Sequence, residues 1–283
     1  MALIMVAESG STRTEWRVGS DITNMVAFET VGLNPFYVSA RDVYLILSMN
    51  FPAQVVKNTI SKVYFYGAGC WYDDQIMVIS DGLRQHLPEA AISVHSDLLG
   101  ASRALFGSSE GITAILGTGA SACFYDGINI FQYVKSLGFI LGDEGSGAFM
   151  GKELLSRYLR RDLSATIVSA FHLKYSLTFE QILKAVYSEP FPNRFLAAFS
   201  EFIHDHRQYP EMDAIIRNSI QLFFERYINK YNEVKSCTMG CVGSVAYYFE
   251  PYLREQAKES GITLGTIQKS AVDELFSYHL RMG

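Results

Sequence analysis

Short runs of mostly apolar residues, separated by Gly, Ser, Asn and Asp, recur along the first hundred residues of the chain. Such runs predict β-strands at 2–8, 14–18, 25–30, 62–66 and 91–95. Between them lie segments whose apolar side chains recur every three or four positions, as in 73–86, and this spacing predicts helices. Ser39 followed by Asp42 predicts the start of another helix. The first hundred residues therefore read β-β-β-α-β-α-β.

The same pattern starts again after residue 110. Three strands are predicted at 111–116, 120–125 and 130–135, and Asp126-Gly127 predicts a hairpin turn between the last two. Helical spacing dominates from 148 to 231, and the remaining predicted elements are a strand at 235–239, a helix at 244–260, a strand at 262–267 and a helix at 271–280. The sequence thus predicts an α/β protein of two linked domains, 1–107 and 108–283. The second domain carries a helical insertion, and the last helix is free to pack back on the first domain.

Composition narrows the classes of function. Of the 283 residues 49% are hydrophobic and 19% charged, and the net charge is −5, which disfavours a nucleic-acid-binding protein. The chain has neither an apolar stretch of about 20 residues nor a basic leader at its start, so we expect a cytoplasmic protein without a membrane partner. Its four cysteines are scattered, as is typical of buried thiols in a reducing compartment.

Two glycine-rich turns are candidates for holding phosphate. Gly10-Ser11-Thr12 follows the first strand of the first half, and Gly117-Thr118-Gly119 follows the first strand of the second half. Glycine lets a backbone approach a ligand closely, and successive N–H groups form a nest that binds anions. One such turn is ordinary hairpin chemistry. Two at matching places in a repeated unit predict a clamp on the phosphates of a nucleotide.

Two carboxylates follow strands of the first half. Glu8 ends the first strand, directly before its turn, and is a candidate anchor for Mg²⁺, which takes few carboxylates and keeps several waters. Asp97 follows the strand at 91–95, at the sheet edge where α/β folds place their sites. The spacing around Asp97 favours a helix cap, and the alternative is a base that accepts the proton of an attacking hydroxyl.

Residues 137–147 are the most unusual segment, because four glycines surround the adjacent carboxylates Asp143 and Glu144 directly before a long helix. Carboxylates held on a tight backbone, next to Gly145, are suited to accept hydrogen bonds from the hydroxyls of a polyol. Gly243-Ser244, between a strand and a helix, is a candidate seat for an adenosine, although a plain turn has the same sequence pattern.

Taken together these motifs resemble the N-acetylglucosamine kinase-like branch of the BadF/BadG/BcrA/BcrD-type ATPases, in the actin/hexokinase/Hsp70 superfamily. The matching segments occur in the family's order, and 142–146 is the most specific of them. They are 7–15, 32–34, 96–97, 116–119, 138–147 and 241–245. The resemblance implies two ribonuclease-H-like domains with an interdomain cleft, which bind ATP and a sugar. It also implies transfer of the γ-phosphoryl group to a sugar hydroxyl at O6.

Individual roles follow from the same resemblance. Asp97 is implied as the general base, in place of the helix cap that the spacing favours, and Glu8 is implied to serve Mg²⁺, although many members of the superfamily have Asp there. The implied sugar contacts are Asn34, Thr118, Asp143, Glu144 and Gly145. The implied nucleotide contacts are Gly10, Ser11, Thr12, Gly117, Thr118, Gly119, Gly243 and Ser244.

Two other functions stay open at this point. One is an ATPase that activates a CoA-ester dehydratase or reductase, a branch of the family that holds an iron–sulfur cluster, although no cluster motif of cysteines is present here. The other is a sugar-sensing module without catalysis. The expected partner is a small sugar of unspecified identity, and a homodimer is compatible with the sequence.

Overall fold

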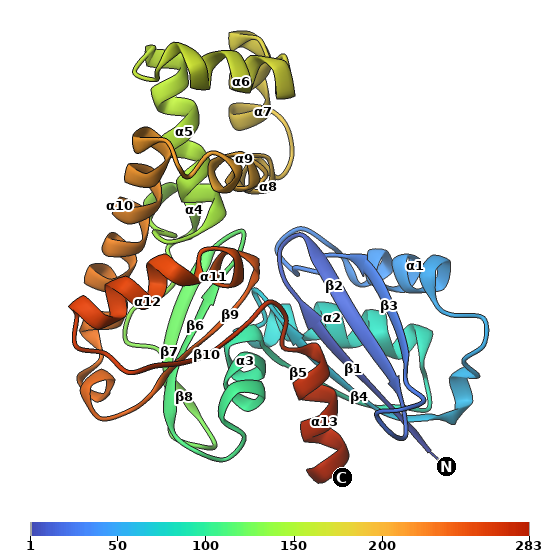
Figure 1. The fold of residues 1–283 in the computed structure, drawn as a ribbon. Helices are drawn as coiled ribbons and strands as arrows, with labels where there is room; N and C mark the ends of the chain where they lie inside the picture. The colour runs from blue at the N-terminus through green and yellow to red at the C-terminus, as the bar shows by residue number, and fades with distance from the viewer. Residues whose placement is uncertain (1, 283) are drawn as a thin grey trace. The chain divides into compact units, whose positions relative to one another are not determined.

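The computed structural model describes residues 2–282, which divide into two compact units (Figure 1). The first unit contains Met1–Thr113, Phe124–Phe131 and Ser270–Gly283, and the second contains Ala114–Cys123 and Gln132–Lys269. Each of the two five-stranded sheets begins with an antiparallel hairpin or meander and continues with parallel strands, so the fold class predicted from the sequence is confirmed.

The first sheet has the strand order β3-β2-β1-β4-β5. β1 pairs antiparallel with β2, β2 pairs antiparallel with β3, and β1, β4 and β5 run parallel. The strands are β1 (Leu3–Ser9), β2 (Arg13–Gly19), β3 (Val26–Val31), β4 (Ile60–Gly67) and β5 (Ala91–Ser96). Around them lie α1 (Ala40–Asn50), the short 3₁₀ helix at Lys57–Thr59, α2 (Asp73–His86), α3 (Asp97–Phe106) and α13 (Val272–Met282). The predicted order of elements is confirmed, including the capping box in which Ser39 and Asp42 begin α1.

Alternation of side chains along the strands gives this sheet two buried faces. Met5, Ala7 and Phe65 belong to the core that contains the apolar sides of α1 and α2. Tyr66, the neighbour of Phe65, is buried toward α13, which packs against β1 and α3. The polar ends of β1, β4 and β5 are therefore carried on a sheet that is covered on both sides.

Two polar contacts hold the C-terminal helix α13 to the rest of the first unit. Arg17 Nε donates to Asp273 Oδ1 at 2.6 Å, near the start of the helix. Farther along, His279 Nε2 lies 2.9 Å from the Tyr66 hydroxyl, which also accepts a hydrogen bond from Arg103 Nη1 at 2.7 Å. Together with the apolar face of the helix, these contacts make α13 a fixed part of the unit.

The second sheet has the strand order β10-β9-β6-β7-β8. Its strands are β6 (Gly111–Leu116), β7 (Ala120–Tyr125), β8 (Ile130–Phe131), β9 (Met239–Val242) and β10 (Leu264–Gln268). The helices of the insertion are α4 (Gly138–Leu141), α5 (Gly147–Arg160), α6 (Ala165–Tyr175), α7 (Phe179–Tyr187), α8 (Pro192–Ala197), α9 (Ser200–Asp205) and α10 (Pro210–Arg226), followed by two 3₁₀ helices at Ile228–Lys230 and Asn232–Lys235. α11 (Ser244–Tyr248) and α12 (Glu250–Glu259) lie between the last two strands.

Three predicted elements of the second half differ from the structure. The strand predicted at 235–239 is wrong. The strand of the structure is β9, Met239–Val242, and all four of its residues are buried in the sheet. The strand predicted at 130–135 is only the two-residue β8. The helix predicted at 244–260 is divided between Tyr248 and Glu250, since Pro251 lacks an N–H and is accommodated in the first turn of a new helix.

The buried His279 predicts a pH-dependent stability. Burial, and then the positive charge of Arg103, lower the pKa of His279 to about 3, whereas an unfolded histidine titrates near ~6.5. Between these two pH values the unfolded chain binds a proton at His279 that the folded chain does not. The contribution of His279 to the free energy of unfolding is therefore full above pH ~6.5 and is lost as the pH falls toward 3. We expect His279→Gln, which keeps a hydrogen-bond acceptor, to flatten the fall in urea midpoint between pH 7 and pH 4.

The control for this prediction is His172→Gln, at an exposed position of α6. It should follow the pH curve of the wild-type protein. Parallel curves for His279→Gln and the wild-type protein would show that His279 does not carry the effect.

Candidate active site

The first glycine-rich turn connects β1 to β2 and packs against Gly32, the residue that follows β3. Gly10 N–H donates to the carbonyl of Arg13 at 2.9 Å, and Gly32 N–H donates to the carbonyl of Thr12 at 3.0 Å. A Cβ at Gly32 would lie 2.5 Å from the Gly10 carbonyl oxygen and 2.6 Å from that of Ser11, so only glycine fits there. The turn is therefore held by backbone contacts, and Gly10 and Thr12 are exposed at its tip.

Asn34 lies two residues beyond Gly32 and is 8% exposed. Its Oδ1 accepts the backbone N–H of Phe36 at 3.0 Å, and a Cβ at Gly69 would come within 2.8 Å of the same oxygen. The amide group is thus fixed beside the turn that follows β4. This rigid placement is suited to a polar group that contacts a ligand.

Asp97 and Glu8 stand at one edge of the first sheet. Ser9, Gly67 and Ser96 pair in register across the parallel strands β1, β4 and β5, and the two carboxylates are the immediate neighbours of Ser9 and Ser96. Burial raises the pKa of both carboxyl groups to about 6, and the charge of Asp97 contributes to the shift of Glu8. Two carboxylates with raised pKa values at one sheet edge indicate a functional site.

Asp97 is the first residue of α3, and Ser96 is the residue that caps this helix. Ser96 Oγ accepts the N–H of Leu99 at 3.4 Å, while Asp97 Oδ1 accepts the N–H of Leu98 at 2.8 Å. The cap that the spacing placed at Asp97 thus lies one residue earlier. Asp97 keeps one bond to the helix, which orients its carboxylate.

Glu8 has both of its hydrogen bonds at the start of the C-terminal segment. Oε2 accepts from the hydroxyl of Ser270 at 2.8 Å and from the N–H of Ala271 at 2.7 Å. Mg²⁺ requires only one or two protein carboxylates, because waters and phosphate oxygens complete its shell. Within residues 2–282 no group of three His, Cys, Asp or Glu side chains is arranged to hold a metal. A single carboxylate such as Glu8 fits a magnesium ion that is carried by a nucleotide.

The second glycine-rich turn connects β6 to β7 and is bound by the start of α5. Gly117 N–H donates to the carbonyl of Gly119 at 3.0 Å, and the N–H groups of Gly147 and Ala148 donate to the carbonyls of Gly117 and Thr118 at 2.8 and 3.2 Å. The turn and the loop before α5 are therefore one assembly.

Asp143 lies within this assembly in a left-handed conformation, with φ of 60°, and is 6% exposed. A Cβ at Gly119 would come within 3.0 Å of Asp143 Oδ2, so the carboxylate lies directly beside the turn. Burial raises its pKa to about 6, and a hydrogen bond from the N–H of Ala120 opposes the shift. Ser136 Oγ donates to Oδ1 at 3.4 Å.

The loop around Asp143 is supported from α10, a contribution that the sequence reasoning missed. The N–H of Asp143 donates to the hydroxyl of Tyr227 at 3.2 Å, and the N–H of Gly145 donates to Ser219 Oγ at 3.1 Å. Glu144 is 3% exposed and forms an ion pair with Arg226. The one signal in the sequence was Ser219, a serine among apolar residues of α10 that shares a helical spacing with Arg226 and Tyr227.

Gly243 lies in the turn after β9 and brings this turn next to the second glycine-rich turn. Its φ is 119°, and a Cβ there would lie 2.3 Å from the carbonyl oxygen of Leu116, the residue before the second glycine-rich turn. Ser244 begins α11 directly afterwards. The second unit thus joins the predicted nucleotide residues 117–119 and 243–244 with the predicted sugar residues 143–145.

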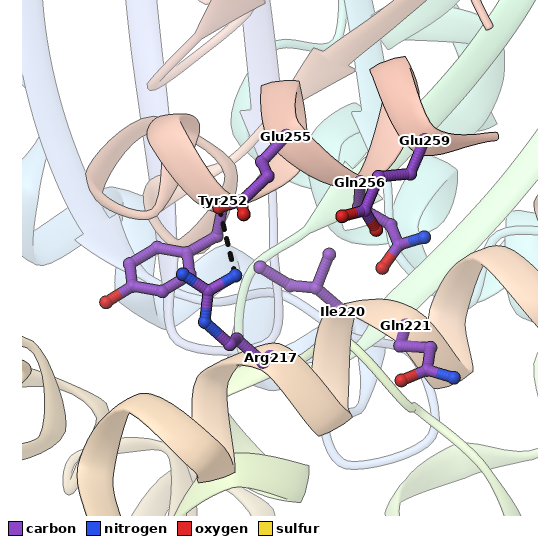
Figure 2. Close-up of a pocket in the computed structure, with 7 residues that line it drawn as sticks. All are labelled: Arg217, Ile220, Gln221, Tyr252, Glu255, Gln256 and Glu259. Atoms are coloured by element: carbon purple, nitrogen blue, oxygen red, sulfur yellow. Dashed lines mark ion pairs between the residues drawn. The ribbon is translucent and has the colours of Figure 1, made fainter. Parts of the chain in front are cut away.

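A surface hollow of the second unit lies away from these residues. This pocket, of about 120 Å³, lies between α10 and α12. Arg217 Nη1 pairs there with Glu255 Oε2 at 2.9 Å (Figure 2). Its lining residues are Arg217, Ile220, Gln221, Tyr252, Glu255, Gln256 and Glu259. None of them is a predicted site residue, and Arg217, the one basic residue of the lining, is paired with Glu255 and Asp213.

Two further properties bear on the predictions from composition. All four cysteines are buried, as expected. Within the part of the chain that the structure describes, no helix is long and apolar enough to cross a membrane.

The two five-stranded sheets, each opening with a glycine-hydroxyl turn, form the two-domain fold that sugar kinases share with actin-like ATPases. Over 99% of both chains the protein is 38% identical to a provisionally named N-acetylglucosamine kinase from Porphyromonas gingivalis, with a TM-score of 0.92. It therefore belongs to the N-acetylglucosamine kinase-like family.

More distant structures share the fold. A provisionally named N-acetylglucosamine kinase from Chromobacterium violaceum is 15% identical over 98% of this chain and 99% of its own, with a TM-score of 0.72. A glucokinase of the ROK family from Streptomyces griseus, solved with glucose and AMPPNP, is 11% identical over 100% of both chains, with a TM-score of 0.59. No family model and no curated protein sequence matches the chain.

The close approach at Gly243 can be tested by stability. Gly243→Ala places a methyl group against the backbone of Leu116 at a positive φ, and we expect a loss of about 2 kcal/mol or more in the free energy of unfolding. Gly117→Ala is the matched control, because a Cβ there meets nothing within 4 Å. Urea denaturation of both variants measures the difference. Equal midpoints would show that the two turns do not approach as closely as described.

Proposed function

We propose that the protein transfers the γ-phosphoryl group of ATP to a hydroxyl of an amino sugar, with N-acetylglucosamine as the first candidate acceptor. The observation that carries this proposal is the 38% identity, over 99% of both chains, to the protein named for that activity in Porphyromonas gingivalis. The proposal includes a cytoplasmic location, where ATP is present.

Asp97 is the proposed general base. Its raised pKa, about 6, leaves it ionised at neutral pH yet makes it a stronger proton acceptor than an exposed aspartate. The hydrogen bond from Leu98 N–H to Oδ1 fixes the direction of the carboxylate. This combination suits acceptance of the proton from an attacking sugar hydroxyl.

The glycine-rich turns are the proposed phosphate contacts. In the first unit these are Gly10, Ser11 and Thr12, and in the second unit Gly117, Thr118 and Gly119, with Gly243 and Ser244 proposed for the adenosine. Both turns are braced by backbone hydrogen bonds, so their N–H and hydroxyl groups need little reorganisation to receive phosphate oxygens. Mg²⁺ bound near Glu8 would supply positive charge to the transferring phosphoryl group.

Asp143 is the proposed main sugar contact of the second unit. Its neighbour Glu144 is already engaged by Arg226, whereas the carboxylate of Asp143 has only weak or backbone partners. Asp143 is thus the better acceptor for sugar hydroxyls, with Gly145 and Thr118 beside it. Asn34 is the proposed sugar contact of the first unit.

The buried thiols weigh against the ATPase-activator alternative. All four cysteines are buried, so none of these thiols is exposed to ligate an iron–sulfur cluster between two subunits. No observation favours a sugar-sensing module without catalysis.

The role of Asp97 predicts a selective loss of turnover. We expect Asp97→Asn to lower turnover by about a hundredfold or more, because the amide cannot accept the proton, while nucleotide affinity stays close to that of the wild-type protein. The matched control is Asp74→Asn, an exposed aspartate in the first turn of α2. Undiminished turnover in Asp97→Asn would remove this residue from the mechanism.

The proposed function itself predicts sugar-dependent release of ADP. The experiment incubates the protein with Mg·ATP and a panel of N-acetylglucosamine, glucosamine, N-acetylmuramic acid and glucose, with a control that lacks sugar. We expect release to depend on an amino sugar. Release that is independent of sugar would support the ATPase alternative, and no release with any sugar would contradict the kinase proposal.

A further inference from the structure

Glu8 is tied to a segment that lies 262 positions further along the chain. Ser270 is the first residue after the last stretch of the second unit, and α13 begins two residues later. Ser270 Oγ and the N–H of Ala271 both donate to Glu8 Oε2, at 2.8 and 2.7 Å. Glu8 was predicted to serve Mg²⁺ because it directly precedes a phosphate turn. Residues near the other end of the sequence hold its carboxylate.

The hydroxyl of Ser270 is oriented by a second hydrogen bond. The N–H of Val272 donates to Ser270 Oγ at 3.3 Å, so the hydroxyl accepts from the helix and directs its own hydrogen to Glu8. Ala271 and Val272 are fully buried, and Arg17 holds the next residue, Asp273. The donor is therefore mounted on a rigid element.

The geometry also divides the carboxylate of Glu8 into two unlike oxygens. Among the described residues, both hydrogen bonds fall on Oε2, and Oε1 is left for a ligand. Partners of a ligating carboxylate commonly fix its rotamer and tune its affinity for a metal. The arrangement at Ser270 is of this kind.

We propose that Ser270 is a positioning residue for the divalent metal of the nucleotide, which acts by holding Glu8 so that Oε1 faces the metal or its bound water. This inference rests on the proposed function in that Glu8 serves Mg²⁺. It adds that the metal site of the first unit depends on the first residues of the C-terminal segment. A purely structural role, in which Ser270 only caps α13, is the competing explanation.

The test measures binding of ADP by titration calorimetry, with Mg²⁺ and again with EDTA, in the absence of sugar. For Ser270→Ala we expect Mg·ADP to bind about tenfold more weakly, in line with loss of a partner to a metal-ligating carboxylate, while metal-free ADP binds as in the wild-type protein. Ser270→Thr restores the hydroxyl and should restore the affinity for Mg·ADP. Glu8→Gln should remove most of the gain in affinity that Mg²⁺ gives.

The matched control is Ser277→Ala, which removes a hydroxyl within α13 that donates to the carbonyl of Asp273 and does not contact Glu8. It should bind Mg·ADP as the wild-type protein does. Thermal unfolding of each variant shows whether the fold is intact.

Two results would overturn the inference. The first is unchanged affinity for Mg·ADP in Ser270→Ala. The second is an equal loss with Mg²⁺ and with EDTA, which is the result that a purely structural role gives. The assay contains no sugar, so a failure of the amino-sugar kinase proposal appears in the ADP-release experiment and leaves this test unaffected.

Discussion

Parallel pairing of β1, β4 and β5 is the constraint on which the first unit depends. Because these strands run in the same direction, Ser9, Gly67 and Ser96 come into register at one edge, and the adjacent Glu8 and Asp97 follow them. Helices cover both faces of the sheet, so the carboxylates are placed where burial raises their pKa values to about 6. Strand order thus determines both the position and the basicity of the two groups.

In the second unit the equivalent constraint is the absence of a Cβ atom at two glycines, Gly243 and Gly119. Gly243 touches the backbone of Leu116, and Gly119 lies against the carboxylate of Asp143. A methyl group at Gly243 would push apart segments that are far separated in the sequence, and a methyl group at Gly119 would crowd the Asp143 carboxylate. Turn, loop and helix start can share one small region only because these positions carry no Cβ.

The sequence predicted the parts of this arrangement that are encoded locally. Short apolar runs between turn residues identified the first eight strands in order, although the eighth was predicted too long, and the glycine-hydroxyl turns identified the hairpins. β9 was misplaced because burial in the sheet selected 239–242 over the preceding residues, a choice that only the neighbouring strands determine. The supports were not predicted, since Ser219 and Tyr227 look like part of an apolar helix and Ser270 stands 262 residues from Glu8.

The adjacent carboxylates Asp143 and Glu144 show how such distant supports give neighbours different roles. By sequence the two are interchangeable acceptors on one loop. In the structure Arg226 neutralises Glu144, while Asp143 is held through its backbone by Tyr227 and has its carboxylate beside Gly119. Two free like charges side by side would repel each other, so pairing one of them lowers the cost of burying the other. Glu144 therefore helps to hold the loop, and this leaves Asp143 as the carboxylate with hydrogen-bonding capacity for a ligand.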